Sequence, residues 1–267
     1  MTIHKTAVIS KSAEIPESCE IGPYTIIGED VILGENVIIK GQSYLEYCTI
    51  GAGSVISPFA SIGTPPQDLS YKDQKTRAVT GVNCLIKENV TINRAAGEEN
   101  SETKIGNNVM LMAGAHVAHN CVVEDDAIFA NNAVIGGHCQ VGRGAFLGGM
   151  SVYHQHVRIG EYAIISGFSA SRMDILPFAK ADGRPALMHG ANIIGLRRRG
   201  FSQEERKNIQ EAFKLICARK YIMSDVLKML EEKFPNDKNI EKMIEFIRTS
   251  KRGIYLAKGN GLGSIEE

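Results

Sequence analysis

Residues 105–169 read IGNNVMLMAGAHVAHNCVVEDDAIFANNAVIGGHCQVGRGAFLGGMSVYHQHVRIGEYAIISGFS, and this stretch repeats with a period of six. Every sixth residue from the first is large and apolar or aromatic: Ile105, Leu111, Val117, Val123, Phe129, Ile135, Val141, Leu147, Tyr153, Ile159 and Ile165. Four places after each comes a small residue: Val109, Ala115, Cys121, Ala127, Ala133, Cys139, Ala145, Ser151, Val157, Ala163 and Ser169. A period of six suits a short strand followed by a sharp corner rather than a 3.6-residue helix.

The N-terminal part follows the same rule. Its large residues are Ile3, Ile9, Ile15, Ile21, Ile27, Leu33, Ile39 and Leu45. Three such units close one triangular coil, so we predict a mainly β fold, a left-handed parallel β-helix of hexapeptide repeats. The large residues fill the prism and the small ones occupy its corners. Residues n and n+18 then stack about 4.8 Å apart, as neighbouring parallel strands do.

Two insertions interrupt the repeat. The segment TPPQDLSYKDQKTRAV (64–79) and a second segment from Ala95 to Thr103 do not follow the period, and one residue is missing between Leu45 and Ile50. We expect the two insertions to leave the prism as loops. Loops on a rigid scaffold are frequent carriers of function.

The repeat ends near Ser169, and the connection DILPFAKADGRPALMHG (174–190) follows. Beyond it, Ser202-Gln-Glu-Glu is a capping box that predicts a helix, and further helices are expected at 224–234 and 236–249. The last residues, GNGLGSIEE (259–267), are expected to be frayed. We therefore predict a left-handed β-helix domain at 1–186 and a C-terminal α-helical domain at 187–267.

Composition excludes several classes of protein. Lysine plus arginine total 30, as do aspartate plus glutamate. The net charge is therefore near zero, and no broad positive potential favours binding to nucleic acid or anionic lipid. No long apolar run predicts membrane insertion or a secretion signal, and the chain reads as cytoplasmic. The six cysteines form no C-x-x-C pair, which argues against a disulfide scaffold or a zinc ribbon. Cys121 and Cys139 fall on corner positions of the repeat.

Histidines cluster within the regular run: His116, His119, His138, His154 and His156. Because the interior positions are taken by aliphatic residues, we expect these imidazoles at or near the outer surface. The eighteen-residue spacing places Gly137 on His119 and aligns Asn120, His138 and His156. A histidine that faces a glycine backbone can supply a general base and an N–H donor for an oxyanion, as acyl transfer to a hydroxyl requires.

Other interpretations of these residues remain open at this stage. The histidines are also compatible with an ordinary polar surface, and His116, His119 and His138 offer three nitrogens to zinc. The run Arg197 to Arg199 suits either a phosphate-bearing ligand or a solvated connection, and Asn192 adds a neutral hydrogen-bonding group nearby.

With these residues in view, the chain resembles the UDP-N-acetylglucosamine O-acyltransferase family from about residue 1 to about 256. The likeness rests on the ordered segments IGPYTIIG, PPQDLSY, GAHVAHNC, ANNAVIGGH, GGMSVYHQ, NIIGLRRRGFS and SKRGI. The resemblance implies a homotrimer with active sites between adjacent prisms. It also implies transfer of an (R)-3-hydroxyacyl chain from acyl carrier protein to the glucosamine 3-position of UDP-N-acetylglucosamine, the first step of lipid A biosynthesis. No metal or other cofactor is implied, because the acyl group arrives on the phosphopantetheine of acyl carrier protein.

The resemblance also implies roles for single residues. His119 matches the general base and Gly137 the backbone oxyanion donor. Gly167 matches the position that limits acyl length. Contacts to the sugar, acyl chain or phosphate are implied for Asp68, His116, His138, His154 and Gln155, and contacts to the nucleotide for Asn192, Arg198 and Arg199.

Three positions depart from the family pattern. Asn120 stands where aspartate is frequent, so we expect a backbone carbonyl to orient His119 instead. Ser70 replaces a lysine, and Ile194 replaces an acidic residue near the nucleotide. The acceptor is therefore open to a 3-amino analogue of the sugar. Two rivals remain: the later N-acyltransferase of the pathway, which carries an extra N-terminal uridine-binding domain, and a trimeric zinc hydratase of the same fold.

Overall fold

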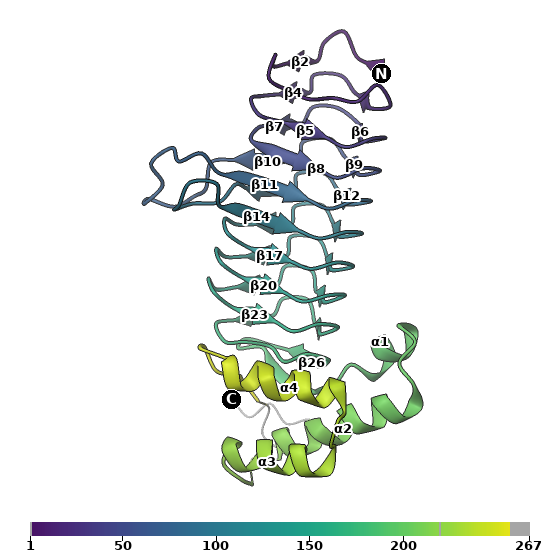
Figure 1. Cartoon of the computed structure of the whole chain (residues 1–267), viewed down its shortest axis with the longest axis vertical. Helices are drawn as coiled ribbons and strands as arrows, with labels where there is room; N and C mark the ends of the chain where they lie inside the picture. Colours follow the sequence, from purple (N-terminus) through teal and green to yellow (C-terminus); the bar gives the residue numbers. More distant parts are fainter. Residues whose placement is uncertain (1, 219, 257–267) are drawn as a thin grey trace.

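The computed structural model describes residues 2–218 and 220–256 and shows a prism of short parallel strands that ends against a group of helices (Figure 1). Three sheets, here named A, B and C, form the walls. The fold is the predicted left-handed parallel β-helix with a C-terminal helical part. No described helix is long and apolar enough to cross a membrane.

The chain visits sheets A, B and C in turn, one strand per wall. Sheet A contains β1 (Thr2–Ile3), β3 (Glu20–Ile21), β6 (Ile38–Ile39), β9 (Val55–Ile56), β12 (Leu85–Ile86), β15 (Met110–Leu111), β18 (Ile128–Phe129), β21 (Phe146–Leu147), β24 (Ile164–Ile165), β26 (Ala179–Asp182) and β27 (Leu187–Ala191). Sheet B contains β2 (Val8–Ile9), β4 (Ile26–Ile27), β7 (Tyr44–Leu45), β10 (Ser61–Thr64), β13 (Thr91–Asn93), β16 (His116–Val117), β19 (Val134–Ile135), β22 (Val152–Tyr153) and β25 (Ala170–Ser171). Sheet C contains β5 (Ile32–Leu33), β8 (Cys48–Ile50), β11 (Arg77–Thr80), β14 (Glu102–Ile105), β17 (Val122–Val123), β20 (Gln140–Val141) and β23 (Arg158–Ile159). The turns between walls are named the A–B, B–C and C–A corners.

The strand register confirms the eighteen-residue coil. His116 pairs with Val134, and the same spacing holds throughout the regular run. The missing residue shortens one coil, so that Ile32 pairs with Thr49. All the large repeat residues from 105 to 165 are at most 4% exposed, and the small ones at most 1%. The pattern weakens at the N-terminal end, where Ile3 is 36% exposed and, among the described residues, β1 has a neighbouring strand on one side only.

Both insertions leave the prism at the B–C corner and lie side by side (Figure 1). The first joins β10 to β11 through residues 65–76, and the second joins β13 to β14 through residues 94–101. The second projects less than expected, since Ala95 and Ala96 are buried and residues 102 and 103 belong to β14. The second loop therefore stands one coil above the corner that carries His119, and the first loop two coils above it.

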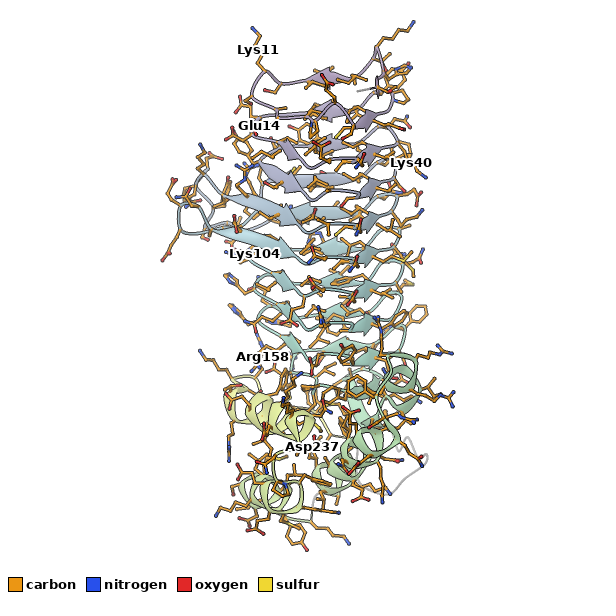
Figure 2. The ribbon with its side chains drawn as sticks, turned by 45° about the vertical axis from the view of Figure 1, so that its right-hand side comes forward. Lys11, Glu14, Lys40, Lys104, Arg158 and Asp237 are labelled. Carbon is orange, nitrogen blue, oxygen red and sulfur yellow. The ribbon has the colours of Figure 1, made fainter. Side chains whose placement is uncertain are left out.

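The expected connection after Ser169 is a closing coil rather than a simple linker. Its residues Ile175, Leu176 and Phe178 are buried, and β26 pairs in parallel with β24 before β27 folds back beside it. The predicted domain boundary at 186 falls between these two strands. The outward side of sheet C is mixed: it carries the charged Lys104 and Arg158 (Figure 2) as well as the exposed Val122.

Four helices follow, of which the first was not predicted. They are α1 (Ile193–Arg198), α2 (Gln203–Cys217), α3 (Met223–Lys233) and α4 (Lys238–Thr249). The capping box at the start of α2 is present, with Ser202 and Glu205 bonding each other's backbone. The apolar face of α2 buries Ile209, Phe213 and Ile216. The expected frayed segment 259–267 lies outside the described residues.

Candidate active site at the B–C corner

His119 and Gly137 occupy successive B–C corners and touch. A Cβ built on Gly137 would lie 2.4 Å from Nε2 of His119, so only glycine leaves room for the ring. The predicted stacking is therefore present. The Gly137 N–H makes no hydrogen bond to the backbone within the described part of the chain, which leaves a donor beside the imidazole.

His119 is buried, contrary to the expectation of a surface position. Its exposed fraction is 4%, whereas His138, His154 and His156 are exposed. The first loop covers the ring and places Asp68 Oδ2 3.5 Å from Nε2. The sequence could not indicate this because the path of the loop is not part of the repeat.

Asn120, rather than a backbone carbonyl, orients His119. Nδ1 of His119 lies 2.8 Å from Oδ1 of Asn120. The amide is itself held at both ends by the second loop: Ala96 N–H donates to Oδ1 at 2.9 Å, and Nδ2 donates to Ala96 O at 3.0 Å. Backbone groups have fixed donor and acceptor roles, so they settle which end of the amide faces the ring.

The amide orientation fixes the tautomer of His119. Since Oδ1 of Asn120 only accepts hydrogen bonds, Nδ1 of the neutral ring must carry the proton. Nε2 then keeps its lone pair and points toward Asp68 and Gly137. The arrangement can therefore remove a proton from a bound hydroxyl or amine.

Ser70 closes a turn with Asp68. Its N–H and its hydroxyl both donate to Asp68 Oδ1 at 2.8 Å, and these bonds lower the pKa of Asp68. Where the family pattern has lysine, this chain has a residue that shapes the loop instead of adding a cation. Asp68 is thus a carboxylate at neutral pH and faces the histidine with its second oxygen.

The neighbouring histidines surround the ring of His119. His138 meets it edge to face, with ring centroids 5.2 Å apart, and His156 stacks on His138 at 4.6 Å. His116 lies 2.7 Å from Thr91 Oγ1 through its Nδ1. Burial lowers the pKa of both His116 and His138, so both are neutral near pH 7.

His154 and Gln155 lie on the B–C corner one coil beyond that of Gly137 and His138, and both are exposed. Nη2 of Arg252 lies 2.9 Å from Nδ1 of His154, so the segment that follows α4 contacts this corner. A cavity of about 480 Å³ opens beside His154, lined by Val152, Tyr153, Ala170, Ser171, Arg172, Arg184, Pro185 and Tyr255. Gly167 lies on the A–B corner, where an added Cβ would meet only the backbone of Gly149 at 3.1 Å.

The predicted nucleotide residues lie at a different corner of the prism. Asn192 caps α1, accepts from Gly195 N–H and donates to Tyr162 O at 2.9 Å. Arg199 reaches Asp126 O at 3.5 Å on the C–A corner, and Arg198 and Ile194 are exposed. Within one chain the structure therefore does not bring these residues to His119.

Replacing Asn120 with aspartate tests the amide clamp. A carboxylate stabilises a protonated imidazole, so we expect the acidic limb of the kcat/KM profile to move about one pH unit upward. It also loses the hydrogen bond donated to Ala96 O, and we expect the melting temperature to drop by roughly 3 °C. A pH series and thermal denaturation measure both effects. An unchanged acidic limb would mean that Asn120 does not face the catalytic ring.

No described group of three or more histidine, cysteine or acidic side chains is arranged to hold a metal ion. The imidazoles of His116, His119 and His138 thus do not converge on one point, as the zinc alternative requires. What the described residues form instead is a buried imidazole beside a glycine backbone, at the corner of a hexapeptide prism. That combination defines a hexapeptide-repeat transferase.

Comparison with known proteins agrees with this class. A model of bacterial transferase hexapeptide repeats matches residues 12–47 and 102–137, and a model described as domain 2 of UDP-N-acetylglucosamine O-acyltransferase matches 174–255. The chain belongs to the UDP-N-acetylglucosamine O-acyltransferase family. It is accordingly an acyltransferase.

Relatives with this name are similar over three quarters or more of the chain. The acyl-[acyl-carrier-protein]–UDP-N-acetylglucosamine O-acyltransferase of Thermodesulfovibrio yellowstonii is 41% identical over 94% of this chain and 98% of its own. That of Fusobacterium nucleatum is 46% identical over 77% of this chain and 79% of its own. The crystal structure of the UDP-N-acetylglucosamine acyltransferase of Bacteroides fragilis is 39% identical, covers 95% of this chain and 99% of its own, and superposes with a TM-score of 0.91.

Proposed function

We propose that the chain transfers an (R)-3-hydroxyacyl group from acyl carrier protein to the 3-hydroxyl of UDP-N-acetylglucosamine, the first step of lipid A biosynthesis. The names of the relatives support the donor and the acceptor. The observation that carries the chemistry is the buried His119, whose Nε2 has a free lone pair beside the Gly137 backbone. We place the reaction in the cytoplasm, where a carrier-protein thioester is available, and no helix among the described residues could cross a membrane.

In the proposed reaction Nε2 of His119 takes the proton of the acceptor hydroxyl as its oxygen attacks the thioester carbonyl. The carbonyl oxygen gains negative charge, which the Gly137 N–H stabilises. Collapse of this intermediate breaks the C–S bond, and the departing sulfur receives the proton from the imidazolium. The ester and the free carrier thiol are formed, and His119 returns to its neutral state. This mechanism needs neither a metal nor another cofactor.

We also propose that three copies complete the site. The outward residues of sheet A are apolar in seven successive coils: Ile38, Val55, Leu85, Met110, Ile128, Phe146 and Ile164. Those of sheet B include Val8, Ile26, Tyr44, Val134 and Val152. These two walls share the A–B corner, so a threefold axis along that corner faces sheet B of one copy toward sheet A of the next.

That arrangement joins the two separated groups of residues. The rim of each cleft then carries the B–C corner of one copy, with His119, and the C–A corner of the next, with Arg199. Co-production of His119→Ala and Arg199→Ala chains tests this proposal. Neither variant alone is expected to be active, whereas mixed trimers contain some intact clefts and regain part of the activity. Activity that stays absent in verified mixed trimers would place the whole site within one chain.

Mass spectrometry of the product tests the reaction. The protein is given a mixture of carrier-bound 3-hydroxyacyl chains together with UDP-N-acetylglucosamine and its 3-amino analogue. We expect an ester of the former as the main product, and a dominant amide would change the assigned acceptor. Gly167→Met in the same mixture is expected to lower the ratio of long to short chains roughly tenfold, because the new side chain occupies the space proposed for the acyl tail.

A further inference from the structure

We propose that Arg94 is a positioning residue of the acyl-transfer site. Its buried guanidinium holds the base of both loops, of which one contacts His119 and the other contacts Asn120, the residue that orients His119. The inference rests on the proposed function of His119. Arg94 does not contact the reacting atoms. It acts through the loops, one of which carries Asp68 and the other Ala96.

The guanidinium of Arg94 is enclosed by polar and aromatic partners. Arg94 is 7% exposed. Its Nη1 lies 2.9 Å from Glu46 Oε1 and 2.9 Å from Gly63 O, and its Cζ lies 4.6 Å from the ring centroid of Tyr47. A buried arginine with this set of fixed partners has one available orientation, so it is a rigid anchor.

The first link runs from Arg94 to Asp68. Nε of Arg94 donates to the Tyr71 hydroxyl at 3.0 Å, and Cζ lies 5.5 Å from the centroid of the same ring. The Tyr71 N–H donates to Asp68 O at 3.1 Å, and its hydroxyl donates to Gln74 O at 3.1 Å. Tyr71 therefore fixes the turn from which Asp68 reaches Nε2 of His119.

The second link runs along the chain to Ala96. The N–H of Arg94 donates to Thr64 O at 3.1 Å, and Asn93 Nδ2 donates to Pro65 O at 3.0 Å, so this segment holds the base of the first loop. Two residues after Arg94, the backbone N–H and C=O of Ala96 form hydrogen bonds with the side-chain amide of Asn120. A shift of the anchor would therefore move both Asp68 and the group that orients His119.

The variants must separate positioning from folding. Arg94→Lys keeps a cation near Glu46 but loses the Nε donor to Tyr71. Tyr71→Phe removes only the hydroxyl and keeps the ring. Arg94→Met would leave Glu46 without its partner in a largely buried place and so risks unfolding. Tyr221→Phe, on an exposed tyrosine before α3, is the matched control and is expected to behave as wild type.

We expect Tyr71→Phe and Arg94→Lys to lower kcat/KM roughly tenfold or more. For Tyr71→Phe, which loses one hydroxyl, the melting temperature should fall by no more than roughly 3 °C. The titratable groups that face His119 are Asp68 from the loop, His116 from β16 and His138 from the next corner. Of these only Asp68 is an anion that stabilises imidazolium. Its displacement is expected to move the acidic limb of the pH profile downward, a change that a purely structural role would not produce.

The same readouts decide the inference. Asp68→Asn alone should give the same pH shift, and adding Tyr71→Phe to it should give no further shift. Wild-type kcat/KM and an unmoved acidic limb in folded Tyr71→Phe would overturn the role of Arg94. Failure of the proposed function is distinct, because wild-type protein would then form no acylated sugar at all. If Arg94→Lys does not fold, Tyr71→Phe still gives the answer.

Discussion

His119→Ala is expected to lower kcat/KM for acyl transfer by roughly 10²–10⁴-fold. General base catalysis contributes a factor of this size, and no other described group can replace Nε2 at the same point. His138 is the neighbouring imidazole, and its ring centroid lies 5.2 Å from that of His119. Initial rates with a carrier-bound 3-hydroxyacyl donor and UDP-N-acetylglucosamine measure the effect.

Two controls accompany this variant. His189→Ala changes an exposed histidine on β27 and is expected to leave the rate unchanged. Sedimentation and thermal denaturation of His119→Ala should show an intact assembly, since the strands on either side of the corner keep their pairing. Turnover within tenfold of wild type in folded His119→Ala would remove the base assignment.

Gly137→Ala is expected to lower kcat/KM by a factor of roughly 100 or more. The added Cβ would lie 2.4 Å from Nε2 and 2.5 Å from Cε1 of His119, so the ring must move. Because Asn120 and the covering loop hold the ring, movement misplaces the base and strains a packed corner. We expect a loss of stability of about 1–3 kcal/mol, measured by denaturant unfolding.

A double variant isolates this clash. In His119→Ala the ring is absent, so adding Gly137→Ala should cost no further stability and little further activity. Additive losses would instead show that the alanine distorts the corner by itself. The N–H of residue 137 is retained in every variant, so the comparison separates the imidazole position from the oxyanion donor.

The sequence predicts the prism well because its rule is local. Each large residue must fit a narrow interior and each small residue must fit a corner. A polar residue at an interior position would therefore stand out as a break in the six-residue period. Ile3 departs from the rule because burial needs a neighbouring strand on both sides, and β1 pairs on one side only among the described residues. The closing hairpin of β26 and β27 was missed because it abandons the six-residue period while still burying Phe178.

The candidate site was predicted only in part. Counting by eighteen places Gly137 on His119, because stacking follows directly from the coil length. It could not place Asp68, or reveal that Ala96 holds Asn120, since the course of an insertion is set by tertiary contacts. Arg94 and Tyr71 give no sequence signal of their own, although Tyr71 lies in the segment PPQDLSY that carries the family resemblance.

The two ends of the prism differ in whether their outermost strands are covered. Helices lie against the C-terminal end, whereas among the described residues β1 and β2 pair on one side only (Figure 1). Open edges are templates for edge-to-edge pairing, and lysine is a frequent guard against it. Lys5 and Lys11 flank these strands, and Lys11 projects from this end (Figure 2). Charged side chains at this position disfavour the edge-to-edge pairing of two prisms.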